Sequence, residues 1–140
     1  MKVQPERMRW SMILAGFLIA GLGVFLDAVT KRWALTALED GRVVPVWGEF
    51  LQLVLTHNPG AAFSTGGKFT PLISAFAILA AIGVCVAIFK SRSWLWSWVL
   101  GLLLAGILGN LRDRLFEPPG PMRGHVIDFI MLPNWPIFNV

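Results

Sequence analysis

Residues 109–129 read Gly-Asn-Leu-Arg-Asp-Arg-Leu-Phe-Glu-Pro-Pro-Gly-Pro-Met-Arg-Gly-His-Val-Ile-Asp-Phe, and the fold has to accommodate the charges that this stretch contains. It follows directly on an uncharged apolar run, and its last aspartate, Asp128, stands between apolar neighbours. Placing Asp, Lys or Arg in the middle of a membrane costs about 2.5–3.5 kcal/mol, so such residues usually face protein or water and usually serve a function. This stretch is therefore the candidate for chemistry.

The composition of the chain is that of a membrane protein. It has 140 residues, of which 56% are hydrophobic and 14% charged, with a mean hydropathy of +0.67. An ordinary soluble domain has about 25% charged residues. We therefore expect one integral membrane domain over residues 1–140. The net charge is +4, but the basic residues are scattered, so no nucleic-acid partner is expected. The single cysteine, Cys85, lies in an apolar run and is interpreted as a packing residue.

Three apolar runs, uncharged apart from Asp27 at the end of the first, predict membrane-spanning helices at about residues 10–27, 70–89 and 93–111. The first run would cover roughly 26 Å as a helix, close to the thickness of the hydrocarbon core. A secretory signal peptide has a similar basic start. This run is longer than is usual for such a peptide, and no small-x-small cleavage site closes it, so a retained span is expected.

Small residues mark one face of the first predicted helix. Gly16, Ala20 and Gly23 follow one another at spacings of four and three residues, which lets another helix approach closely. Asp27 continues this face, and Lys31 follows one turn later. Two interpretations remain open: Asp27 points into the bundle, or it forms an interfacial charge pair with Lys31 that ends the helix.

The segment between the first two spans, residues 32–68, predicts a small sheet lying on the membrane. Residues 50–56 are rich in strand-forming side chains, and residues 43–47 flank a proline in a way that suits an edge strand. Asn58 either sets the turn that follows or braces a polar site. His57 has no partner at metal-ligand spacing, so no metal site is expected.

The end of the third predicted span carries a second polar face. Gly106, Asn110 and Asp113 lie at i, i+4 and i+7. Asp113 and Arg114 could form a pair that ends the helix, or they could belong to a site. The alternation of spans places five polar residues on one side of the membrane, and this convergence is a stronger argument than any one of them: they are Asp27, Asn58, Asn110, Asp113 and Asp128.

The basic residues predict the orientation. Five of them lie in two short segments, residues 1–9 and 90–93, whereas seven are spread over two much longer segments on the other side. By density, the N-terminus and the turn at 90–93 are expected to be cytoplasmic and the polar cluster to lie near the outer face.

The order of motifs resembles the lipoprotein signal peptidases, the type II signal peptidases of bacteria. The resemblance implies a helical bundle of four membrane spans with a small outer β-cradle, in the inner, cytoplasmic membrane. It also implies an intramembrane aspartyl endopeptidase that needs no metal or cofactor and cleaves prolipoproteins whose cysteine carries diacylglycerol. We expect a monomer in contact with membrane lipid. The motifs are Asp27-Ala-Val-Thr-Lys31, Asn58-Pro-Gly-Ala-Ala-Phe63, Gly109-Asn-Leu-Arg-Asp-Arg114, Val126-Ile-Asp-Phe129 and Phe138-Asn139.

The same resemblance implies a role for each polar residue. Asp128 would be one of two catalytic aspartates. The family motif continues Phe-Asn-x-Ala-Asp with the second one, which the 140-residue sequence does not reach, so we expect a C-terminally truncated chain that lacks the fourth span and activity. Ala28 stands where the family usually has Gln, and the loop 115–125 is longer than expected, which could alter the placement of Asp128. The implied supporting or substrate-binding positions are Asp27, Lys31, Asn58, Asn110, Asp113, Arg114 and Asn139.

A non-enzymatic membrane protein is the alternative. In a lipid-binding protein or a small transport subunit, the same acidic and amide residues would line a polar cavity. That class has no need for a second aspartate beyond Val140.

Overall fold

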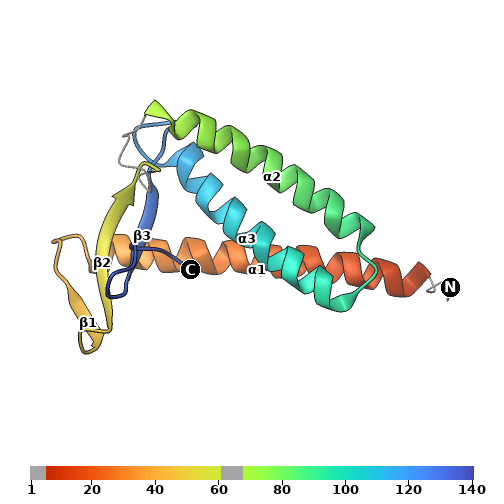
Figure 1. The fold of residues 1–140 in the computed structure, drawn as a ribbon, viewed down its shortest axis with the longest axis horizontal. Coiled ribbons are helices and arrows are strands. Elements are labelled where there is room, and N and C mark those ends of the chain that lie inside the picture. The colour runs from red at the N-terminus through yellow and green to blue at the C-terminus, as the bar shows by residue number, and fades with distance from the viewer. Residues whose placement is uncertain (1–5, 61–67) are drawn as a thin grey trace.

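The computed structural model describes residues 6–60 and 68–140. Three long helices form the body of the molecule: α1 (Glu6–Ala37), α2 (Thr70–Lys90) and α3 (Trp94–Phe116). A small antiparallel sheet lies at one end of the helices (Figure 1). Its strands, in the spatial order β1-β2-β3, are β1 (Val44–Trp47), β2 (Leu51–Asn58) and β3 (Val126–Met131). The predicted architecture, mainly helical with a small sheet, is confirmed.

All three helices are long and apolar enough to cross a membrane. Their large apolar side chains point mostly outward; Leu14, Leu18 and Leu22, which follow one another at four-residue spacing on α1, are 59–62% exposed. A helix that is apolar all round suits either a protein core or a lipid environment. Since these faces are uncovered, the lipid environment fits them.

The helices pack through small residues. α1 packs mainly against α3, and a Cβ atom added at Gly101 of α3 would lie 2.5 Å from the carbonyl oxygen of Gly16 in α1. One added at Gly23 would overlap with the Cβ atom of Ala105. The predicted contact face with Gly16 and Gly23 is therefore confirmed, and it brings the two backbones as close as glycine allows.

Helix α1 continues through its polar residues to Ala37. Asp27 and Lys31 are 3% and 2% exposed, so they point into the bundle. The alternative in which this pair ends the helix at the membrane boundary is wrong. Lys31 pairs with Asp27 on the same helix and with Asp113 of α3, as described below, so opposite charges lie together in the interior of the protein.

The third strand of the sheet comes from the segment after α3, and the sequence did not predict it. β3 pairs with β2 in a register that places Asp128 opposite Thr56 and Val126 opposite Asn58. Its residue Phe129 packs in a small core with Ala34 of α1 and with Leu38, which directly follows this helix. The sheet is thereby fixed to the helix end, and β3 carries its aspartate toward the bundle.

The long loop between α3 and β3 is held against the helices. The backbone N–H of Gly124 donates to the carbonyl oxygen of Arg114 at 3.0 Å, and that of His125 donates to Pro118 at 3.1 Å. Ser74 of α2 donates its hydroxyl to the carbonyl of Met122 at 2.9 Å. These contacts hold the end of the loop next to the C-terminal end of α3, and β3 begins directly after it.

Candidate active site

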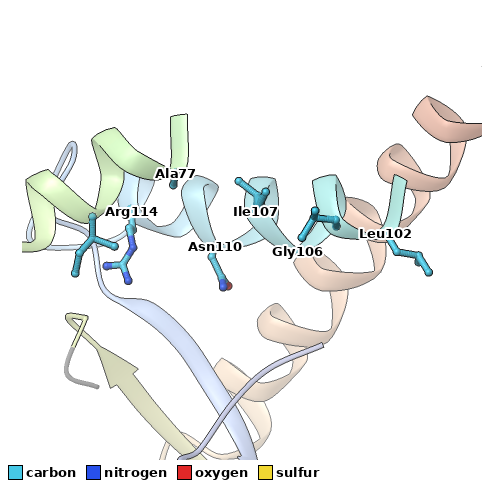
Figure 2. A pocket seen from close by; sticks show the side chains of 8 residues that line it. Ala77, Leu102, Gly106, Ile107, Asn110 and Arg114 are labelled. Carbon is cyan, nitrogen blue, oxygen red and sulfur yellow. The ribbon is translucent and has the colours of Figure 1, made fainter. Parts of the chain in front are cut away.

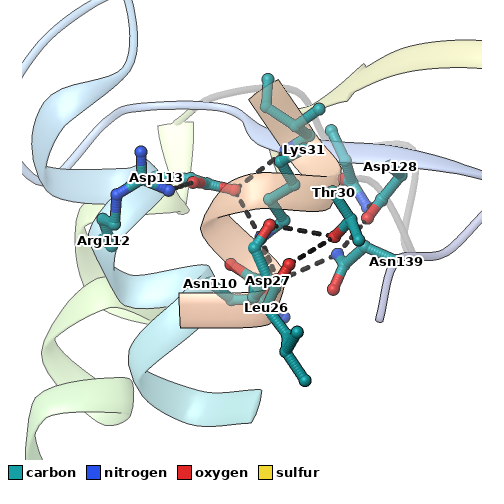
Figure 3. A network of polar contacts seen from close by, with 11 residues as sticks. Leu26, Asp27, Thr30, Lys31, Asn110, Arg112, Asp113, Asp128 and Asn139 are labelled. Atoms are coloured by element: carbon teal, nitrogen blue, oxygen red, sulfur yellow. Dashed lines mark hydrogen bonds and ion pairs between the residues drawn. The ribbon is translucent and has the colours of Figure 1, made fainter. Parts of the chain in front are cut away.

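Asp128 is a buried carboxylate, 4% exposed, and each of its oxygens accepts a hydrogen bond from a side-chain amide. The Nδ2 group of Asn58 donates to Oδ2 at 2.9 Å, and that of Asn139 donates to Oδ1 at 2.6 Å. Asn58 is carried by the neighbouring strand β2, and Asn139 follows Phe138, which bridges to Ile130 of β3. The two bonds fix the orientation of the carboxyl group. Figure 3 labels Asn139, which donates one of them.

Asn110 of α3 links this carboxylate to the helices. Its Oδ1 atom accepts hydrogen bonds from Nδ2 of Asn139 and from Nζ of Lys31, both at 3.2 Å. The amide chain thus runs from Lys31 on α1 through Asn110 and Asn139 to Asp128 (Figure 3).

Lys31 lies between two aspartates. Its Nζ atom is 2.9 Å from Oδ1 of Asp27, one turn earlier on α1, and 2.7 Å from Oδ2 of Asp113 on α3. The side chains of all three residues are at most 4% exposed. A buried ion pair offsets the cost of desolvation only when its geometry is good and its remaining polar atoms find partners. Here the ammonium group uses all three N–H donors, since Asn110 takes the third, whereas Oδ2 of Asp27 has no hydrogen-bond partner among the described residues.

Asp113 also forms a hydrogen bond with β3, the strand that contains Asp128. Its Oδ2 atom accepts the backbone N–H of Ile127, the residue before Asp128, at 3.2 Å. Its other oxygen is 3.6 Å from Nη1 of Arg112, an ion pair too long for a hydrogen bond. Asp113 therefore connects α1, α3 and β3.

Arg114 contributes an unused donor. Its guanidinium group is buried, with the residue 8% exposed, and its Nη1 atom has no hydrogen-bond partner among residues 6–60 and 68–140. A buried N–H group without a partner is costly, and such groups in native proteins call for an explanation such as a ligand.

Two cavities meet at Arg114 and Asn110. The first, of about 330 Å³, contains Asp128 together with Asn58 and Asn139. The second, of about 450 Å³, lies between α2 and α3 and is mainly apolar (Figure 2). Figure 2 shows the Asn110 side chain at this groove, with Arg114 one turn further along α3. The polar cavity with the carboxylate therefore adjoins an apolar groove of a size that small-molecule sites occupy. Besides the two shared residues, the groove is lined by Ile73, Ala77, Leu102, Leu103, Gly106 and Ile107.

The structure brings together the candidate residues that the sequence suggested. Asn110 and Asp113 both contact Lys31, whereas Gly106 on the same helix lines the open groove. Ala28 is half-buried next to Asp27. Residues 61–63, the end of the motif that begins at Asn58, lie outside the described part of the chain.

Sequence reasoning missed two features of this site. One is the pairing of β2 with β3, which places Asn58 beside Asp128; the other is the backbone N–H of Ile127. Neither leaves a local signal, because the first joins segments 70 residues apart and the second is a backbone group. Within residues 6–60 and 68–140, no group of three or more His, Cys, Asp or Glu side chains is placed to hold a metal ion.

Comparison with known proteins gives consistent matches over nearly the whole chain. Residues 19–140 match the family model that describes signal peptidase (SPase) II. A lipoprotein signal peptidase of Rhodococcus jostii (strain RHA1) is 46% identical over 138 residues, which cover 97% of this chain and 69% of the relative. One of Mycobacterium avium (strain 104) is 41% identical, covering 97% and 72%. One of Mycolicibacterium smegmatis is 40% identical, covering 98% and 57%.

A solved bacterial membrane enzyme, determined by the in meso method at 2.3 Å resolution, has the same fold. Its TM-score is 0.75 at 29% identity, and the match covers 89% of this chain and 76% of the solved one. A second such structure, at 1.9 Å, gives the same TM-score and identity and is covered to 80%. The chain is thus shorter than each of these relatives, spanning between 57% and 80% of their lengths.

Proposed function

Because the chain belongs to the signal peptidase II family, we propose that the complete protein is an intramembrane aspartyl endopeptidase acting on prolipoproteins. It removes the signal peptide from precursors whose lipobox cysteine carries diacylglycerol, and it cuts N-terminal to that cysteine. The observation that carries this proposal is Asp128, a buried carboxylate that two amides orient in a polar cavity. This cavity shares Asn110 and Arg114 with an apolar groove.

Peptide hydrolysis by aspartates needs two carboxyl groups. One is ionised and takes a proton from the attacking water; the other is protonated, polarises the scissile carbonyl and helps to protonate the departing nitrogen. Asp128 supplies one of the two groups. In this proposal the second follows Val140 in the complete protein, at the aspartate of the family motif Phe-Asn-x-Ala-Asp, and residues 1–140 alone do not cleave.

The two cavities suggest how a lipid-modified precursor is held. The polar cavity takes the peptide around the scissile bond, while the apolar groove between α2 and α3 takes apolar parts of the substrate. Arg114 stands where the cavities meet, and its unpartnered Nη1 group can donate to a substrate carbonyl. The amides of Asn58 and Asn139 keep the carboxyl group of Asp128 in place.

The proposed setting is the bacterial inner membrane, which the protein crosses several times as a monomer. The N-terminus and the α2–α3 turn are cytoplasmic, because basic residues are densest there. Asp128 then lies near the outer face, where precursors present their lipid-modified cysteine.

Replacing Asp128 by Asn in the complete protein tests the assignment. The variant keeps the shape of the side chain but cannot accept or donate the proton, so cleavage of a diacylglyceryl-modified precursor should fall by about 10²–10⁴-fold. Asp40→Asn is the matched control, because Asp40 is exposed and pairs with neighbouring Arg42 at the surface. Turnover by Asp128→Asn at the rate of the control would exclude Asp128 as the catalytic group.

The reading frame beyond Val140 provides the second test. We expect Ala-Asp within a few residues, followed by an apolar run of about 20 residues, the length that spans a membrane. The complete protein should cleave the precursor, and residues 1–140 should not. Cleavage by residues 1–140 alone contradicts the proposed division of roles, and a stop codon after Val140 favours the non-enzymatic alternative.

A further inference from the structure

We infer that Lys31 is a positioning residue that anchors the backbone and the side-chain amides next to Asp128; this inference rests on the proposed function for its catalytic consequence. Lys31 does not touch Asp128 and is not among the residues lining the cavity that contains it. It is 2% exposed, and its ammonium group is fully used by Asp27, Asp113 and Asn110. Any effect on Asp128 therefore passes through these partners.

The first connection runs through the backbone. Oδ2 of Asp113 accepts from Nζ of Lys31 at 2.7 Å and from the N–H of Ile127 at 3.2 Å. The ammonium group holds this oxygen in place, and the oxygen holds the peptide unit just before Asp128. The backbone of β3 is thereby tied to α1 at the residue next to the carboxylate.

The second connection runs through two amides, whose orientation Lys31 fixes from one end and Asp128 from the other. An ammonium group has donors only, so it requires an oxygen from Asn110. That oxygen also faces Asn139, which must therefore present its NH₂ group to Asn110. The same NH₂ group gives its other hydrogen to Oδ1 of Asp128.

The carboxylate of Asp128 is also an acceptor, so it favours the same orientation of Asn139 from the other end of the chain of contacts. Lys31 anchors the Asn110 oxygen, which is the second acceptor for the NH₂ group of Asn139. Without Lys31, Asn110 loses this anchor, and the amide that reaches Asp128 is less firmly held. A buried cation two residues away in the network thus limits the motion of the group that orients the carboxylate.

The test removes Lys31 without leaving two unpaired carboxylates. Asp27→Asn/Lys31→Met is compared with Asp27→Asn alone, so that the pair differs only at Lys31. In the double variant the remaining buried carboxylate, Asp113, keeps Arg112 nearby and the N–H of Ile127. Both proteins are prepared as the complete chain in the same detergent micelles, and their melting temperatures are recorded to establish that each is folded.

Two readouts are required. In precursor cleavage, kcat of the double variant should be about 10²-fold below that of Asp27→Asn, as expected for a misplaced reacting group, while KM changes less than about twofold because the cavity lining is unaltered. In nitrogen-15 NMR, hydrogen exchange of the Ile127 backbone amide and of the Asn139 side-chain amide should be at least about fivefold faster in the double variant, as expected when a hydrogen bond is lost.

The outcomes separate this inference from the proposed function. If Asp27→Asn cleaves and the double variant has the same kcat or the same exchange rates, the positioning role is overturned although the protease assignment stands. If the wild-type complete protein cleaves nothing, the proposed function fails, and the exchange rates alone then decide whether Lys31 orders the network. Faster exchange supports the inference, and equal exchange overturns it.

Discussion

Lys31 and Arg42 both pair with aspartates, but in opposite surroundings. Lys31 is buried with Asp27 and Asp113, whereas the side chains of Arg42 and Asp40 are 60% and 59% exposed. Removing one partner of a buried pair leaves an uncompensated charge, which costs about 3–5 kcal/mol, while an exposed pair contributes about 0–1 kcal/mol.

We therefore predict that Lys31→Met alone strongly destabilises the protein and that Arg42→Met does not. The free energy of unfolding should fall by about 3–5 kcal/mol in the first variant and by less than about 1 kcal/mol in the second. Denaturant unfolding in one detergent provides the comparison. Equal losses in the two variants would mean that water or another group compensates the buried aspartates.

At the level of single residues, part of the site could be predicted from the sequence. The four-residue spacing of Asp27 and Lys31 predicted that they share a face, because side chains at i and i+4 are neighbours on a helix. The partners of Asp128 could not be derived this way. Asn58 and Asn139 reach it from separate segments, and only the pairing of β2 with β3 and the bridge at Phe138 bring them together.

Among the elements, the helices were predictable and β3 was not. Long apolar runs identify spanning helices because a bilayer requires about 20 apolar residues. The run from Val126 to Met131 is short and interrupted by Asp128, so it has neither the length of a span nor the alternation of a half-buried strand. Its strand conformation depends on the distant partner β2.

The contact between α1 and α3 gives a prediction for these two elements. A methyl group at Gly101 would press on the backbone oxygen of Gly16 and on Ile19 of α1, whereas one at Gly106, later on the same helix, meets nothing within 4 Å. Gly101→Ala should therefore force the helices apart and cost about 1–3 kcal/mol, an overpacking penalty.

Gly106→Ala is the matched control for stability, since the same substitution in open space should gain up to about 1 kcal/mol from helix propensity. The melting temperatures in one detergent should consequently change in opposite directions. Similar changes in both variants would show that the distance between α1 and α3 does not limit stability.

On the scale of the whole molecule, the helices separate two chemically different ends. The sheet and the cavity with Asp128 lie at one end, and the α2–α3 turn lies at the other, near the start of α1 (Figure 1). The turn carries Lys90 and Arg92, and Arg9 of α1 contacts the carbonyl oxygen of Phe89 there. A dense group of basic residues favours the cytoplasmic side, so the proposed orientation places the sheet outside.

Cysteine labelling tests this orientation. In a Cys85→Ser background, Trp47→Cys places a thiol at the end of β1, where Trp47 is 72% exposed, and Arg92→Cys places one at an exposed position between α2 and α3. A charged maleimide cannot cross the bilayer because carrying a charge through its centre is costly. In intact spheroplasts it should modify the first thiol and spare the second, and permeabilisation should expose both. Labelling of the α2–α3 turn in intact spheroplasts would place Asp128 on the cytoplasmic side, where a protease acting on exported precursors could not reach its cleavage site.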